Sequence, residues 1–232
     1  MAAIESNPGA ILSKLAIIAL DGPSGVGKST TAKLVAQRLG WDYLDTGAMY
    51  RATALALQRA GVELSDWKAL EQELASLRID QRGSRTLLGE EDVGDLIRTP
   101  EITKLVTPVS ANARVREVLV EQQQTIGRRG GWVVDGRDIG TVVFPSACCK
   151  IFLTASKESR ARRRHLEQQT KGIGTAMTLA DVLADLQRRD HADFTRAASP
   201  LRQAEDAVAL DSSDMTLEAV VAWVVHHHRE HG

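Results

Sequence analysis

The sequence has few cysteines and few aromatic residues. Only 2 of its 232 residues are Cys, and aromatic residues make up 4%. The two thiols, Cys148 and Cys149, are adjacent, which excludes a disulfide framework and a zinc site built from two cysteine pairs. We expect both to be buried and inert. The scarcity of aromatic side chains argues against a base-stacking platform for nucleic acid.

An excess of either charge is also missing. The chain has 29 Lys and Arg residues against 30 Asp and Glu residues, a formal net charge of −1. Proteins that coat nucleic acid through counterion release need a positive surface, so we expect no nucleic-acid partner. Of the basic residues, however, 21 are Arg and 8 are Lys. Arg binds phosphate with paired hydrogen bonds, so an anionic ligand would explain this bias. Codon preference is the alternative explanation.

Long hydrophobic runs and a signal-peptide pattern are absent as well. The apolar run nearest the start, residues 15–20, is far shorter than the roughly 20 residues of a membrane span. Residues 1–14 contain no basic segment followed by an apolar one. We interpret them as a flexible N-terminal tail and expect a cytoplasmic protein with no membrane partner.

Short apolar segments alternate with helical patterns along the chain. Apolar segments occur at 15–20, 41–44, 132–134, 149–153 and 207–210, and helical patterns at 28–39, 48–60, 156–169 and 216–228. Gly40 and Gly61 are stop signals for the first two helices. This alternation predicts an α/β fold in which a five-stranded parallel sheet has helices on both faces.

Polar residues follow four of the apolar segments directly. Asp21, Asp45, Asp135 and Thr154 stand at these positions. Ligands of open parallel sheets bind beyond the carboxyl ends of the strands. We therefore expect these four residues to converge on a single site.

Two stretches interrupt the alternation. Residues 62–131 contain helical patterns at 65–77 and 101–124 and a polar segment, 80–95, suited to small antiparallel strands. We interpret this stretch as an inserted lobe, which leaves 15–61 and 132–232 as the core. Residues 157–178 are interpreted as a mobile lid; they carry a Gly-containing tip at 171–174 and a basic cluster of Arg160, Arg162, Arg163 and Arg164.

A phosphate-binding loop follows the first apolar segment. Residues 22–29 read Gly-Pro-Ser-Gly-Val-Gly-Lys-Ser, which matches the P-loop pattern between a strand and a helix. The backbone N–H groups of such a loop surround an anion, Lys28 reaches the β- and γ-phosphates, and the Ser29 hydroxyl ligates Mg²⁺. The expected ATP-binding residues are Gly22, Pro23, Ser24, Gly25, Val26, Gly27, Lys28, Ser29 and Thr30.

A second set of phosphate-binding groups separates this chain from single-nucleotide modules. Arg51 lies on the helix that follows Asp45, and Asp135-Gly136-Arg137-Asp138 forms a turn after the third apolar segment. No N-K-x-D guanine-reading segment is present. Two sets of anion-binding residues at one sheet edge indicate a kinase whose acceptor also carries a phosphate.

The motifs resemble those of bacterial cytidylate kinases from about residue 15 to 225. The resemblance rests on the blocks at 21–28, 45–51 and 135–145, and on Arg189, Asp190, Asp193 and Arg196. It implies a P-loop kinase core, an inserted lobe at 62–131 that binds the nucleoside monophosphate, and an Arg-rich lid. It also implies transfer of the ATP γ-phosphoryl group to CMP or dCMP, with Mg²⁺ as cofactor.

The resemblance also implies residue roles. Lys28, Arg137, Arg196 and Arg163 would be catalytic, and the CMP-binding residues would be Thr46, Tyr50, Arg51, Thr107, Arg116, Asp135, Arg137, Asp138, Arg189, Asp193 and Arg196. Arg51, Arg137 and Arg196 would bind the acceptor phosphate; Thr107, Arg116 and Asp138 would read cytosine; Arg189 and Asp193 would contact the ribose. Position 107 departs from some relatives, since Thr stands where they have Ser.

Two alternatives remain at this point. One is a P-loop kinase for UMP, GMP or another small molecule, and the other is a non-catalytic nucleotide-binding or RNA-binding module. The block at 135–145 and the long insert oppose the first, while the doubled set of phosphate ligands opposes the second. We expect ATP and CMP or dCMP as ligands and a monomeric chain.

Overall fold

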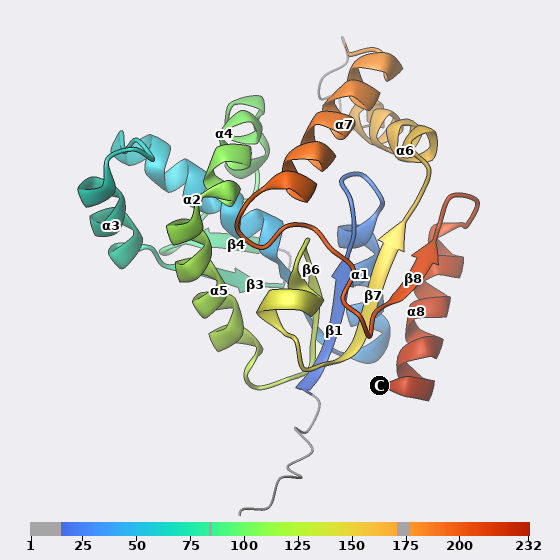
Figure 1. Cartoon of the computed structure of the whole chain (residues 1–232). Coiled ribbons are helices and arrows are strands. Elements are labelled where there is room, and N and C mark those ends of the chain that lie inside the picture. Colours follow the sequence, from blue (N-terminus) through green and yellow to red (C-terminus); the bar gives the residue numbers. More distant parts are fainter. Residues whose placement is uncertain (1–14, 84, 171–176) are drawn as a thin grey trace, which may run out of the picture.

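A five-stranded parallel sheet runs through the centre of the computed structural model, which describes residues 15–83, 85–170 and 177–232 (Figure 1). In spatial order its strands are β2 (Asp42–Asp45), β6 (Trp132–Asp135), β1 (Leu15–Asp21), β7 (Ala147–Thr154) and β8 (Val208–Asp211). All neighbouring strands in this sheet are parallel. The predicted α/β class and the five expected strands are confirmed.

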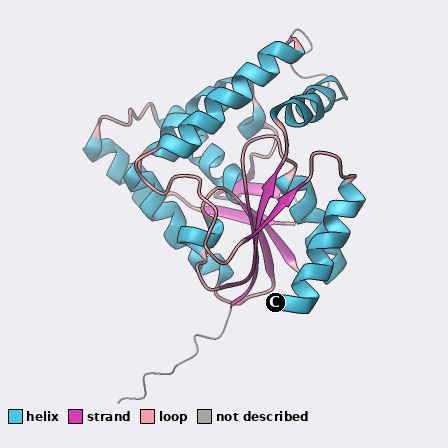
Figure 2. Cartoon of the chain, turned by 45° about the vertical axis from the view of Figure 1, so that its right-hand side comes forward, coloured by secondary structure: helices cyan, strands magenta, loops and turns pink. Residues whose placement is uncertain are grey.

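Helices cover both faces of this sheet (Figure 2). Side chains alternate between the two faces along a strand, so Ile18 and Leu20 of β1 pack with α1 (Lys28–Leu39) and α8 (Leu217–His231). Ile17 and Ala19 point the other way and join a cluster with side chains of α2 (Thr46–Ala60) and α5 (Ala113–Gly127). Burial on both sides explains why the three inner strands, β1, β6 and β7, are mostly apolar.

The glycine stop signals act as the sequence predicts. Gly40 and Gly61 adopt left-handed conformations with φ values of 66° and 64° after α1 and α2. Their N–H groups donate to carbonyl oxygens of the last helical turn, which satisfies acceptors that a helix end leaves open. The chain then turns back directly into β2 after the first helix.

Residues 62–131 contain both helices and a second sheet. The elements are α3 (Trp67–Ser76), the antiparallel strands β3 (Ile79–Arg82), β4 (Arg85–Leu88) and β5 (Glu91–Asp92), a 3₁₀ turn η1 (Leu96–Arg98), α4 (Pro100–Ala111) and α5. Antiparallel strands in the polar segment 80–95 are confirmed.

The single helical pattern expected over residues 101–124 is wrong, because the chain forms two helices there. They separate at Asn112, whose backbone is extended with φ −72° and ψ 122°. Its side-chain oxygen accepts hydrogen bonds from Arg114 N at 3.0 Å and Val115 N at 3.1 Å, which caps α5. Apolar residues continue at helical spacing across the break, so periodicity alone does not reveal it.

The segment 62–131 shares its core with the main sheet. Leu70 of α3, Ile102 of α4 and Leu119 of α5 are buried in the same cluster as Ile17 of β1 and Val134 of β6. The segment is therefore packed on the sheet through one continuous apolar contact region. Its role as an inserted lobe that binds the nucleoside monophosphate stays a prediction.

Two helices pack beside each other beyond the carboxyl end of β7: α6 (Lys157–Thr170) and α7 (Leu179–Thr195) (Figure 1). Helix α7 was not predicted, although Thr178 and Asp181 form a capping box at its start. Ala161, Val182 and Leu186 form a small apolar cluster between the two helices. The expected lid tip at 171–174 and the expected tail at 1–14 lie outside the described residues.

Among the helices of the described residues, none has the length and apolar character needed to cross a membrane. The thiols differ in environment: Cys149 is buried, and Cys148 is half-buried with its Sγ atom 3.3 Å from Ile17 O.

Candidate active site

A cleft of about 610 Å³ lies along the carboxyl ends of the parallel strands and reaches under α6 and α7. Of the predicted site residues, the following line it: Gly25, Val26, Gly27, Lys28, Ser29, Thr30, Thr46, Tyr50, Arg51, Thr107, Arg116, Asp135, Arg137, Asp138, Arg163, Arg189, Asp193 and Arg196. Gly22, Pro23 and Ser24 do not line it. The structure thus brings together predicted site residues that are as far apart in the sequence as Gly25 and Arg196.

The phosphate loop enters the cleft between β1 and α1. Gly22 has φ +146°, and a side chain at this position would meet Leu153 O of β7 at 2.1 Å, so only glycine fits. Gly27, with φ +100°, precedes α1 without a side-chain hydrogen bond to the helix end. The first N–H groups of α1 therefore face the cleft without a side-chain cap, as anion binding requires.

Lys28 is buried at the start of α1. Its Nζ atom donates to Pro23 O at 2.8 Å within the loop. Burial, followed by the nearby Arg137 charge, lowers the pKa of Lys28 to about 7, although the nearby carboxylates oppose this shift. A polyphosphate in the cleft would restore the ammonium form, because its negative charge compensates the lost hydration.

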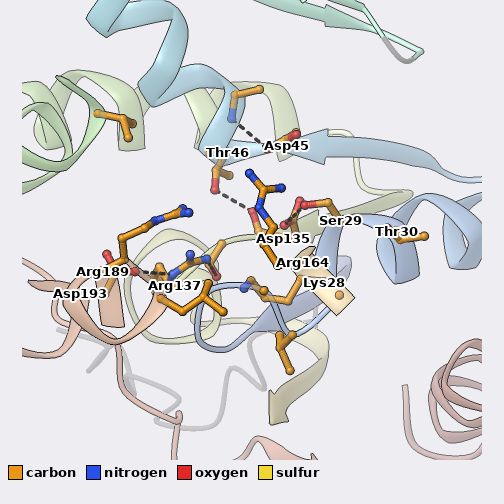
Figure 3. A pocket seen from close by; sticks show the side chains of 18 of the residues that line it. Lys28, Ser29, Thr30, Asp45, Thr46, Asp135, Arg137, Arg164, Arg189 and Asp193 are labelled. Carbon is orange, nitrogen blue, oxygen red and sulfur yellow. Dashed lines mark hydrogen bonds and ion pairs between the residues drawn. The ribbon is translucent and has the colours of Figure 1, made fainter. Parts of the chain in front are cut away.

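Asp135 connects the loop to the neighbouring strands at the middle of the cleft (Figure 3). Ser29 Oγ donates to Asp135 Oδ2 at 2.9 Å, and Tyr43 Oη donates to Asp135 Oδ1 at 2.6 Å. Thr46 Oγ1 donates to the backbone oxygen of Asp135 at 2.7 Å. Burial raises the pKa of Asp135 to about 6, with the nearby Asp45 charge adding to the effect. Sequence reasoning missed Tyr43, since it looked like an ordinary strand residue.

A buried charge cluster closes one end of the cleft. Arg116 of α5 forms an ion pair with Asp138 Oδ2, and Arg196 Nη2 lies 3.3 Å from Asp138 Oδ1. The Arg116 guanidinium lies 5.3 Å from the centre of the Tyr50 ring. Within the described residues, the buried Arg116 Nε atom has no hydrogen-bond partner. Such a donor is costly to leave unpaired and marks a position where a ligand acceptor fits.

Arg137 lies between this end and the phosphate loop. Its Nε atom donates to Asp193 Oδ2 at 2.7 Å, and its Nη2 atom donates to Ser24 Oγ at 2.9 Å. Burial opposes the charge on Asp193, yet Arg137 and neighbouring arginines hold the pKa of this carboxyl below its usual value. Figure 3 shows Arg137, Arg189 and Asp193 together on one side of the cleft.

Arginines outnumber carboxylates in this part of the cleft. Burial lowers the pKa of Arg51 to about 10, with Arg189 and Arg98 adding positive charge. Arg189 also has a lowered pKa, first from burial and then from Arg137. Arg51 Nη1 is oriented by Thr103 Oγ1 at 2.8 Å. Mutual repulsion among buried arginines is relieved by a bound anion.

The four arginines of the predicted lid take different positions. Arg163 and Arg164 line the cleft. Arg163 Nη1 donates to Ser212 Oγ at 3.1 Å, and Arg164 Nη1 donates to Glu167 Oε2 at 2.9 Å. Arg162 is exposed, whereas Arg160 is buried away from the cleft against Ser24 and Asp190. Of the four arginines in the expected lid, Arg163 and Arg164 therefore face the cleft, and Arg160 and Arg162 do not.

The sequence also gave no reason to select several other residues of the cleft wall. Arg98, Thr103 and Ser110 line it, and Arg98 Nη2 lies 3.5 Å from Asp45 Oδ2. Gln81 of β3 accepts from Asp45 N at 2.8 Å and donates to Asp45 O at 2.7 Å, so the small sheet is bound to the edge of the large one. None of these positions belongs to a local motif.

Comparison with known proteins identifies the family. Residues 18–230 match the family model described as cytidylate kinase. A cytidylate kinase of Pseudomonas paraeruginosa is 44% identical over 222 residues, covering 93% of this chain and 96% of that protein. A cytidylate kinase of Rhodococcus jostii is 50% identical over 210 residues, covering 88% of this chain and 91% of the relative.

A similar fold occurs in a solved structure of distant sequence. An uncharacterized protein from Eubacterium ventriosum is 10% identical and has a TM-score of 0.50, with 94% of this chain and 99% of that chain covered. At this identity the likeness concerns the fold alone.

Proposed function

The chain belongs to the cytidylate kinase family, and from this premise we propose that it transfers the γ-phosphoryl group of ATP to CMP and dCMP. It is a phosphotransferase, so the alternative of a non-catalytic module is not favoured. Two substrates with phosphate groups must meet in one cleft for this reaction. The positions of Lys28 and Asp138 in the same cleft support the assignment of a donor side and an acceptor side.

The donor side is the phosphate loop. Backbone N–H groups of residues 25–29 would surround the β-phosphate, as the uncapped start of α1 favours. Lys28 would donate to the β- and γ-phosphates and compensate their charge. Arg163, from the cleft wall on α6, would add a positive charge near the transferred group.

The acceptor phosphate would bind among the buried arginines. Arg51, Arg137 and Arg196 line this region, and each would present guanidinium N–H groups to phosphate oxygens. Arg189 and Asp193, which come from α7, would contact the ribose. Phosphate binding would relieve the repulsion among these buried arginines. Much of the binding energy of the acceptor would therefore arise at its phosphate, which is the reacting group.

The choice of CMP as acceptor depends on the polar groups that would contact the base. The Asp138 carboxylate would accept from the cytosine amino group, and Arg116 Nε, which is buried without a partner among the described residues, would donate to the ring nitrogen or carbonyl. Thr107 lines the same cleft and keeps a hydroxyl for the base. Uracil would present an acceptor to Asp138, and such a buried mismatch costs about 1–3 kcal/mol.

The chemical step needs no protein nucleophile. An oxygen of the CMP phosphate forms a bond to the γ-phosphorus, while the bond from this phosphorus to the β–γ bridging oxygen breaks and leaves ADP. Lys28, Arg137 and Arg196 would compensate the charge on the migrating group. The protein contributes mainly the alignment of both phosphates.

The donor set around Ser29 fits Mg²⁺. Ser29 Oγ and the Asp135 carboxylate are adjacent hard oxygen donors, and the described residues contain no cluster of three metal-binding side chains. Mg²⁺ commonly uses few protein ligands and completes its shell with water and phosphates. Bound there, the ion would neutralise charge on the β- and γ-phosphates.

Water must be kept away from the γ-phosphate, because hydrolysis would compete with transfer. Helices α6 and α7 cover the cleft and would serve as a closing lid together with the segment 62–131. A cytoplasmic, monomeric enzyme remains our expectation from the sequence.

A panel of acceptors tests the proposal. ADP release with ATP and Mg²⁺ would be measured for CMP, dCMP, UMP, GMP and AMP, each at several concentrations. We expect kcat/KM to be highest for CMP and dCMP and at least about 10-fold lower for UMP, given the mismatch at Asp138. A preference for UMP or GMP would contradict the proposal.

A further inference from the structure

Ser24, in the middle of the phosphate loop, is bound by side chains of two distant helices. Arg160 Nη1 of α6 donates to Ser24 O at 2.8 Å, and Ser24 N donates to Asp190 Oδ1 of α7 at 2.9 Å. The same Arg160 nitrogen lies 2.5 Å from Asp190 Oδ2. We call these three residues the Ser24 clasp. A single ion pair thus satisfies both backbone polar groups of one loop residue.

The clasp is almost completely removed from solvent. Ser24 is 1% exposed, Arg160 4% and Asp190 8%. Replacing a buried ion pair by apolar residues of similar volume often leaves stability unchanged or improves it, because both charges lose hydration. Stability alone is therefore a weak reason for such a pair. The directional hydrogen bonds to Ser24 are what apolar residues could not provide.

The Ser24 clasp binds the phosphate loop outside the cleft. Neither Arg160 nor Asp190 lines the cleft, whereas the loop from Gly25 onward does. Leu186 of α7 supports the adjacent residue, since a side chain added to Gly25 would lie 3.1 Å from the Leu186 Cδ2 atom. Both helices therefore contact the loop at residues 24 and 25: Arg160 and Asp190 do so outside the cleft, whereas Leu186 also lines it.

We propose that Arg160 and Asp190 are positioning residues that hold the phosphate loop in the conformation that binds the ATP phosphates. The inference rests on the proposed function, because it assigns the donor phosphates to this loop. Loop N–H groups bind phosphate only when several of them point to one place. The clasp fixes the peptide that precedes these groups and also fixes α6 and α7, which carry Arg163 and Arg189, against the loop.

A double variant separates positioning from stability. Arg160→Met with Asp190→Leu removes both charges together, so neither is left buried and unpaired. We expect a modest fall in its melting temperature, because Ser24 N and Ser24 O lose their buried hydrogen-bond partners. ATP affinity, measured by calorimetry without acceptor, should fall by about 10-fold or more, and kcat/KM for ATP should fall with it. The KM for CMP should change much less.

A second variant covers the case in which the double variant does not fold. Arg160→Lys retains the charge opposite Asp190, but its shorter chain lacks the guanidinium geometry that reaches Ser24 O. We expect an intermediate loss of ATP affinity with a melting temperature near the wild type. Wild-type ATP affinity in every folded variant of this pair would overturn the inference.

The matched control is an ion pair far from the loop. Arg114 Nε lies 2.6 Å from Glu71 Oε1, within the segment 62–131. Arg114→Met with Glu71→Leu should leave ATP affinity unchanged, and an equal loss there would show that the effect is unspecific and overturn the inference. A wild-type chain that binds ATP but phosphorylates no CMP would refute the proposed function, while the affinity comparison would still test the clasp.

Discussion

Ser29 Oγ donates to Asp135 Oδ2 at 2.9 Å, although the two residues are 106 positions apart in the chain. Ser29 is the second residue of α1, at the end of the phosphate loop, and Asp135 ends β6, the strand beside β1. The parallel register aligns Asp135 with Leu20 on one side and with Asp45 on the other. The sheet thus places two oxygen donors at the point where the donor phosphates would bind.

Metal removal should stop the reaction without preventing acceptor binding. With a chelator in excess, we expect no measurable ADP release, while CMP still binds in calorimetry because its proposed contacts are arginines and Asp138. Ser29→Ala should raise the Mg²⁺ concentration required for half-maximal rate, and Ser29→Thr, which keeps the hydroxyl, should change it little. Equal Mg²⁺ requirements for the Ala and Thr variants would argue against a metal-binding role of this hydroxyl.

Lys28→Met should separate activity from stability. The ammonium is buried and its pKa is lowered by burial, so the folded chain carries a charge that it stabilises poorly. We expect kcat to fall by at least about 100-fold, since one preorganised donor to the reacting group is lost. The melting temperature without nucleotide should equal or exceed that of the wild type. A large drop in melting temperature would show that Lys28 stabilises the empty loop.

Asp138→Asn tests base recognition with little change in shape. The amide would accept less strongly from cytosine and would donate to the uracil oxygen, so the ratio of kcat/KM for CMP over UMP should fall by about 10-fold or more. The melting temperature should also fall, because Arg116 and Arg196 lose a buried carboxylate partner. An unchanged CMP/UMP ratio would mean that Asp138 does not read the base.

Asp21 should make stability depend on pH. Its carboxylate accepts from Ile139 N at 2.9 Å and from Gly140 N at 2.8 Å, and burial raises its pKa to about 6 from its usual value of 3.8. Between these values the folded chain binds a proton that the unfolded chain releases. The stabilisation that Asp21 adds to the free energy of unfolding is therefore present at low pH and is lost as the pH rises from about 4 to about 6.

The Asp21→Asn variant removes this titration. The free energy of unfolding of the wild type minus that of the variant should fall by up to about 3 kcal/mol across this pH window and stay constant above it. Chemical denaturation of both proteins at pH 4, 5, 6 and 7 measures this difference in the free energy of unfolding. A difference that rises with pH would show that the two N–H bonds outweigh burial and would contradict the expected sign.

Much of the fold could be predicted because its signals are local. The strand residues 15–20 are apolar throughout and end at Asp21, and Gly40 and Gly61 terminate helices through their own backbone conformations. The break at Asn112 could not be predicted in the same way, since apolar spacing continues across it. Helix α7 was not predicted, although the capping box of Thr178 and Asp181 is a local signal for its start.

The amino-acid sequence by itself determined the phosphate loop, the positions of the five strands in the chain and the polar residues at which four of these strands end. These depend on residue type and spacing within a few positions. Only the tertiary structure decided that Tyr43 donates to Asp135 and that Arg160 binds Ser24 and Asp190 instead of facing the cleft. The Arg-rich composition was compatible with an anionic ligand or with codon preference, whereas the role of each arginine depends on partners that are distant in sequence and adjacent only after folding.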